Sequence, residues 1–78
     1  MASIGVRFGA ALRRRREAAE LSQEALAAAA GLHRNYVGLL ERGKQVPTLA
    51  VVEKLAVALG VTMVALVREV EQTGTDAT

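Results

Sequence analysis

The strongest constraint on the fold is the position of Gly31, which lies between two short segments rich in helix-forming residues. The first segment, residues 22 to 30, begins with Ser22, whose hydroxyl can accept a hydrogen bond from a free backbone N–H and so cap a helix. Only glycine adopts a left-handed backbone conformation without steric cost, so Gly31 predicts a sharp turn into a second helix. Ala27 and Ala30 would let the two helices cross closely, because their side chains end at a methyl group.

The second of these helices is predicted to have one packed face and one free face. Tyr36, Val37 and Leu40 recur on one side at helical spacing. The other side carries Arg34, Asn35, Gly38, Leu39 and Arg42. Two short helices joined by a tight glycine turn, with the second helix free on one face, are typical of a helix-turn-helix that places its second helix in the major groove of DNA.

The stretch from Leu21 to Met63 resembles the DNA-binding domain shared by lambda-type phage repressors, Cro-like proteins and their bacterial relatives. The resemblance covers residues from about 6 to about 70. It implies an all-α fold, a compact five-helix bundle that contains the helix-turn-helix. The matching positions are Ser22, Gln23 and Glu24; Ala30 and Gly31; Glu41, Arg42 and Gly43; Pro47 and Thr48; and Leu59, Gly60 and Val61.

Length and composition agree with a single small all-α domain. The chain has 78 residues, half of them apolar, but only one Phe, one Tyr and no Trp, so the core must be built from Leu, Val and Ala on helices. The absence of cysteine excludes disulfides and thiolate metal sites, and no apolar run reaches the roughly 18 residues of a membrane span. We therefore expect a cytoplasmic protein, and the resemblance implies that it is associated with bacterial or phage DNA. The net charge of +2 permits a polyanionic partner without demanding one.

The first helix is predicted to span roughly residues 4 to 19, with Phe8, Ala11, Leu12 and Ala19 in one apolar stripe. Arg15 falls on the same stripe, so either its stem covers the core while its head reaches water, or the helix is rotated slightly. Consecutive helical residues point in different directions, so at most two of the four arginines from 13 to 16 can face DNA. The resemblance implies a structural ion pair between Arg16 and Glu41, which would fix the first helix against the third.

Two further helices are predicted after Thr48. The fourth would be capped by that hydroxyl, end at Gly60, and bury Val51, Val52, Leu55, Ala58 and Leu59. The fifth would run from about Thr62 to about Gln72 and carry more apolar surface than one small bundle can cover. We expect a homodimer interface there, as in related stand-alone domains, although these residues could instead close the monomer core. The interface residues would be Met63, Val64, Leu66, Val67 and Val70.

The expected domain organisation is therefore one DNA-binding and dimerisation domain over residues 1 to 72, followed by a disordered tail over residues 73 to 78. The tail is small and polar and lacks a packing pattern.

The free face of the motif's second helix supplies the candidate base-reading residues. Arg34 and Asn35 lie at its exposed start and suit guanine O6/N7 and adenine N6/N7, although either could instead hold a phosphate. His33 could touch DNA or simply occupy a capping position. Leu39 stands where relatives often carry a polar reader and could pack on a thymine methyl or make no contact. A lone histidine is no metal site, and no metal, cofactor or small-molecule ligand is expected.

Other residues are candidates for binding the phosphate backbone. Gln23 sits in the first turn of the motif's first helix, where its amide and the helix N-terminal N–H groups can meet a phosphate, as its family counterpart does. Tyr36 could pack its ring beside the core and send its hydroxyl to a phosphate. Relatives hold the sugar-phosphate backbone from the loop after the recognition helix, a role that the resemblance assigns to Arg42, Lys44 and Gln45.

The sequence thus predicts a transcriptional regulator that binds double-stranded DNA as a homodimer at a palindromic operator. The small size and the string HRNYVGLLERG most resemble the controller proteins of restriction-modification systems. A phage-type repressor or an antitoxin-like autoregulator would share these features, and a helical adaptor that binds no DNA is the alternative from another class. An enzyme is not expected, because no paired carboxylates, phosphate-binding glycine loop or nucleophile beside the single His is evident.

Overall fold

Side-chain hydroxyls define where four of the five helices begin. Ser3, Ser22, Thr48 and Thr62 each accept a hydrogen bond from the backbone N–H three residues later, over 3.0 to 3.2 Å. The computed structural model describes residues 2 to 76, with side chains described as far as Thr73, and contains only helices in that range. The helices are α1 (Ile4–Ala18), α2 (Gln23–Ala30), α3 (Arg34–Glu41), α4 (Leu49–Leu59) and α5 (Met63–Asp76). The predicted all-α, five-helix class is confirmed.

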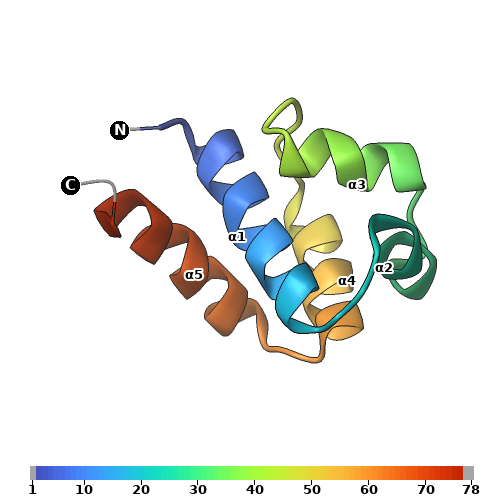
Figure 1. Cartoon of the computed structure of the whole chain (residues 1–78). Helices are drawn as coiled ribbons and strands as arrows, with labels where there is room; N and C mark the ends of the chain where they lie inside the picture. Colours follow the sequence, from blue (N-terminus) through green and yellow to red (C-terminus); the bar gives the residue numbers. More distant parts are fainter. Residues whose placement is uncertain (1, 77–78) are drawn as a thin grey trace.

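The helices pack around one small core (Figure 1). Helix α1 packs against α5 on one side and α3 on the other, while α2 packs against α3 and α4, and α4 against α5. Every helix contributes at least one fully buried aliphatic side chain, which explains how so few aromatic residues suffice. These side chains are Leu12, Leu26, Val37, Leu40, Leu55 and Leu66.

Two boundaries differ from the sequence prediction. Ala19 is exposed and lies just beyond the end of α1, so its assignment to the buried stripe was wrong. Helix α5 continues to Asp76 rather than ending at Gln72. The Thr73 hydroxyl in this added turn accepts a hydrogen bond from Arg14 of α1, a tertiary contact that sequence periodicity does not indicate, and donates to the Glu69 carbonyl oxygen over 2.8 Å. Residues 77 and 78 of the predicted tail lie outside the described residues.

The position of Arg15 is explained by an acidic partner on α5. Its Nε is buried and lies 3.1 Å from Oε1 of Glu69, without the alignment of a normal hydrogen bond. Oε2 of the same carboxylate accepts a hydrogen bond of 3.1 Å from Nε of Arg14. The head of Arg15 therefore meets a charge of the protein itself, and Glu69 ties α1 to α5.

In the part of the chain that the structure describes, no single helix is long and apolar enough to cross a membrane; only α4 and α5 together, bent by 103°, would meet that length and composition.

The first four helices end in the same backbone arrangement, but one of them lacks glycine at the left-handed position. After α2, α3 and α4 this position is filled by Gly31, Gly43 and Gly60, with φ between 69° and 73°. After α1 it is filled by Glu20, with φ of 60°. The Glu20 N–H donates to the Glu17 carbonyl and the Leu21 N–H to that of Arg16, which is the hydrogen-bonding of a Schellman motif. Glu20 thus carries a steric cost that glycine would avoid.

We expect Glu20→Gly to raise the free energy of unfolding by about 0.5 to 1 kcal/mol, because it relieves this strain and removes a negative charge from a helix C-terminus. The midpoint of urea unfolding measures the change. Gly60→Ala is the matched control, since an added Cβ there meets nothing within 4 Å and the variant should lose about the same amount through backbone strain alone. An unchanged midpoint for Glu20→Gly would mean that the left-handed glutamate is not strained.

Candidate nucleic-acid interface

The carboxylate of Glu41 joins the three helices that form the predicted DNA-binding face. Glu41 ends α3 and its side chain is only 3% exposed. Its two oxygens accept hydrogen bonds from Nε and Nη2 of Arg16 over 2.6 and 3.0 Å, so the ion pair implied by the resemblance is present. Arg16 also donates to the Leu21 carbonyl, and Nε2 of Gln23 donates to Oε1 of Glu41 over 3.0 Å. One buried acid therefore fixes α1 and α2 against the end of α3.

These partners decide the charge state of the acid. Burial alone would raise the pKa of Glu41, but the hydrogen bonds from Arg16 and Gln23 and the positive charge of Arg16 outweigh it, so this pKa lies below its ordinary value of 4.5. The same hydrogen bond raises the pKa of Arg16. Both groups are charged at neutral pH, and the pair stabilises the fold only while Glu41 is ionised.

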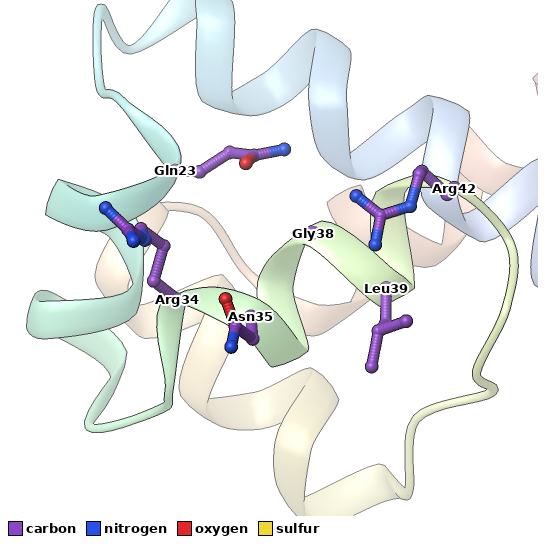
Figure 2. A pocket seen from close by; sticks show the side chains of 6 residues that line it. All are labelled: Gln23, Arg34, Asn35, Gly38, Leu39 and Arg42. Carbon is purple, nitrogen blue, oxygen red and sulfur yellow. The ribbon is translucent and has the colours of Figure 1, made fainter.

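A shallow hollow of about 350 Å³ opens on the outer face of α3 (Figure 2). Gly38 forms its floor, since a Cβ added there would lie 3.2 Å from Nη1 of Arg42 and 3.7 Å from Oε1 of Gln23. The Arg42 guanidinium therefore lies back over α3 rather than pointing along the loop that follows. The side chains around this hollow combine two guanidinium groups with two amides and one leucine. They belong to Gln23, Arg34, Asn35, Leu39 and Arg42.

The structure brings together most of the residues that the sequence singled out. Arg34 and Asn35 are exposed in the first turn of α3, and half-buried Leu39 lies one turn further along (Figure 2). Tyr36 is half-buried against the core. Lys44 and Gln45 are exposed in the loop after α3, whose Gly43 lies against Val6 of α1. His33 is exposed at the cap position of α3, but its side chain makes no capping hydrogen bond.

Two interactions in this region were not anticipated from the sequence. Gln23 was predicted as a phosphate ligand, but its amide nitrogen is already engaged by Glu41 and its oxygen lies toward Gly38. Arg34 donates from Nη1 to Oε2 of Glu24 over 2.9 Å, across the turn between α2 and α3. Residues ten positions apart show no spacing signal for such a pair, because the helix crossing alone brings them together.

The predicted apolar face of α5 is smaller than expected. Leu66 and Val70 were assigned to a dimer interface, but both are buried in the monomer core, because this side of α5 packs on α1 and α4. Met63 is half-buried against the same core. Only Val64 and Val67 are exposed, with 65% and 44% of their surface accessible.

Val67 connects two hollows. One, of about 320 Å³, runs along α5; the other, of about 160 Å³, is almost wholly apolar and reaches the start of α1 and the loop before α4. The first is lined by Met63, Val64, Val67, Arg68 and Glu71. The second is lined by Ile4, Phe8, Val46, Pro47, Val52, Val67 and Val70.

Comparison with known proteins gives relatives over most of the chain. A family model described as a helix-turn-helix domain matches residues 7–70. Control protein C.MunI of Mycoplasma sp is 38% identical over 73 residues, covering 92% of this chain and 99% of C.MunI.

Solved structures resemble the fold closely. The restriction-modification controller protein C.AhdI from Aeromonas hydrophila is 47% identical, with a TM-score of 0.78 over 80% of this chain and 94% of that one. The restriction-modification controller protein C.Esp1396I, solved as a tetramer in complex with its natural 35 base-pair operator, has a TM-score of 0.84 over 94% and 96% of the two chains. Its identity is 20%, so this second likeness concerns the fold alone.

We expect Glu41→Gln to lower the free energy of unfolding at pH 7 by about 3 kcal/mol, because Arg16 would keep its charge while losing the opposite one. Because the pKa of Glu41 is lowered in the folded state, the stabilisation is complete above about pH 4.5 and is lost as the pH falls through the folded value. Urea unfolding between pH 3 and pH 7 should therefore show a weaker pH dependence in the variant.

Glu17→Gln serves as the control, since Glu17 pairs with Arg13 over 3.3 Å on the exposed surface of α1. This variant should lose less than about 1 kcal/mol. Equal losses for the two variants would show that the buried pair contributes no more than a surface pair.

Proposed function

This chain belongs to the helix-turn-helix family that includes restriction-modification controller proteins, and we propose that it is a transcriptional regulator that binds operator DNA as a homodimer. The hollow on α3 is the observation that carries this proposal. Two arginines and two amides from α2, α3 and the residue after α3 gather at the outer face of α3, whose inner face buries Val37 and Leu40 completely. Such side chains match the donor and acceptor pattern of base edges in the major groove.

In the proposed complex, the start of α3 enters the major groove. Arg34 and Asn35 read base edges there, and Leu39 packs on a thymine methyl. The phosphate backbone is bound by residues at this end of α3 and in the loop that follows the helix. They are His33, Tyr36, Lys44 and Gln45. Gln23, held by Glu41, meets the backbone with its remaining amide hydrogen and the N-terminal N–H groups of α2.

Arg42 has a different place in this proposal from the one that the sequence suggested. Its guanidinium lies over Gly38 within the hollow, so it reaches the groove rather than only its rim. Because Gly38 offers no side chain, part of the sequence preference comes from groove shape and DNA bending.

The homodimer is proposed to form through the exposed apolar surface of α5. Val64 and Val67 are its centre, and the apolar hollow beside Val67 extends it toward the start of α1. Two copies related by a two-fold axis would place their recognition helices about 34 Å apart, one turn of DNA. The operator is therefore proposed to be palindromic.

The proposed subtype is a restriction-modification controller protein that acts on bacterial or phage DNA in the cytoplasm and regulates its own operon. The near-complete coverage of C.MunI supports this subtype, and the fold is shared with a controller protein whose structure contains its operator.

Selection of binding sites from a random DNA pool tests the function directly. Purified protein should retain a two-fold symmetric motif with half-sites about one helical turn apart. Enrichment no better than background, at salt low enough to keep phosphate contacts, would instead favour a helical adaptor that binds no DNA.

Substitutions separate base reading from backbone contact. Arg34→Ala should weaken binding to the selected site by about 1 to 3 kcal/mol and relax the preference at one base pair. Lys44→Ala should weaken binding to all sequences alike. It should also lower the slope of the logarithm of the binding constant against the logarithm of salt concentration by about one unit. Affinities measured on the selected site, a single-base variant and random DNA distinguish the two. A uniform loss from Arg34→Ala would make it a phosphate contact.

Val64→Glu tests the dimer interface without touching the core. A carboxylate buried without a partner at the centre of the interface should weaken dimerisation by more than about tenfold, as measured by sedimentation equilibrium. Val57→Glu is the matched control, because Val57 is 74% exposed on α4, away from this surface, and should leave the dimer intact. An unchanged Val64→Glu dimer would place the interface elsewhere.

A further inference from the structure

Arg34 is the proposed base-reading residue that already has an acidic partner. It lines the hollow on α3, and its Nη1 donates to Oε2 of Glu24 over 2.9 Å. Arg42, the other arginine of the hollow, forms no ion pair within the described residues. Glu24 stands in the first turn of α2, so the carboxylate that pairs with Arg34 comes from the neighbouring helix. The Arg34 side chain extends toward that helix (Figure 2).

The hydrogen bond to Glu24 leaves one complete edge of the guanidinium free. Guanine O6 and N7 accept two parallel N–H bonds from a single edge of an arginine. Since Nη1 is engaged by the carboxylate, the edge formed by Nε and Nη2 remains available for such a pair. The carboxylate also removes part of the rotational freedom that Arg34 would otherwise lose on binding.

The same carboxylate makes the competing phosphate contact less favourable. A free arginine at the rim of a groove can turn to either strand's backbone, which strengthens binding to every sequence. A negative charge beside Arg34 repels phosphates while leaving the neutral base edges unaffected. The side chains of Arg34 and Glu24 are 64% and 73% exposed, so their ion pair is weak in water. Binding to DNA displaces that water, which strengthens the attraction between the two charges.

We propose that Glu24 is a specificity-determining residue that acts through Arg34, by holding its guanidinium toward base edges and away from phosphates. This inference rests on the proposed function, because it concerns how the same face reads DNA. Glu24 contacts no base in this arrangement, and its role is to position the residue that does.

Two substitutions that remove the same charge test this role. Glu24→Ala removes the acceptor for Arg34, whereas Glu24→Gln keeps an oxygen at the same distance along the side chain. Dissociation constants are measured for the selected operator, for the operator changed at the base pair that Arg34 reads, and for random DNA. Glu20→Gln is the control, since Glu20 is an exposed acid in the preceding turn with no ion pair within the described residues.

Glu24→Ala should lower the preference for the operator over its single-base variant on the order of tenfold, because Arg34 loses the acceptor that holds it toward the base edge. This loss comes on top of the tighter binding to every sequence that removal of the charge causes in both Glu24 variants. Glu24→Gln should retain most of the preference, with a loss of about two- to threefold, because the hydrogen bond survives without its charge. Glu20→Gln should leave the preference unchanged. Equal losses for Glu24→Ala and Glu24→Gln would overturn the positioning role and leave only a general charge effect.

A double-mutant cycle confirms the route through Arg34. In the Arg34→Ala background, Glu24→Ala should have no further effect on the preference at that base pair. A persistent effect would mean that Glu24 acts without Arg34, which overturns the inference while leaving the proposed function intact. If the unaltered protein shows no preference for any sequence, the proposed function itself fails.

Discussion

The proposed DNA-binding face depends on one buried carboxylate. Glu41 is almost completely shielded from water, and an ionised acid in that position is tolerated only because Arg16 and Gln23 donate three hydrogen bonds to it. These donors belong to α1 and α2, so the carboxylate receives its hydrogen bonds only when both helices meet the end of α3. The approach is close, since a Cβ added to Gly9 of α1 would lie 2.3 Å from the Leu40 carbonyl oxygen. These contacts of α1 and α2 therefore fix the orientation of α3, the proposed recognition helix.

The basic residues divide into structural and available groups. All four arginines from 13 to 16 pair with carboxylates of the protein, which fasten α1 internally and to α3 and α5. Arg42 and Lys44, near the outer face of α3, form no ion pair within the described residues, and Arg34 shares its charge with Glu24. The small net charge is therefore less informative than its distribution, because attraction to DNA depends on cations left without an internal partner.

Helix α5 serves the fold with one side and the proposed dimer with the adjoining side. Leu66 and Val70 close the core, while Val64 and Val67 remain exposed beside an apolar hollow. The Glu69 carboxylate, paired with two arginines of α1, adds to the apolar packing that holds α5 on the bundle. Dimerisation through this helix would therefore position two complete DNA-binding faces relative to each other.

Local chemistry in the sequence was sufficient to predict the five helices and the ends of α2 and α4, because capping hydroxyls and left-handed glycines act within a few residues of the chain. The ends of α1 and α5 were not predicted correctly. The pair between Arg16 and Glu41 followed from the family resemblance. The partition of α5 between core and surface, the pairing of Arg34 with Glu24 and the return of Arg42 over Gly38 could not be predicted. These depend on the angle at which helices cross and on which side chains then fall within a few ångströms, and only tertiary packing determines those distances.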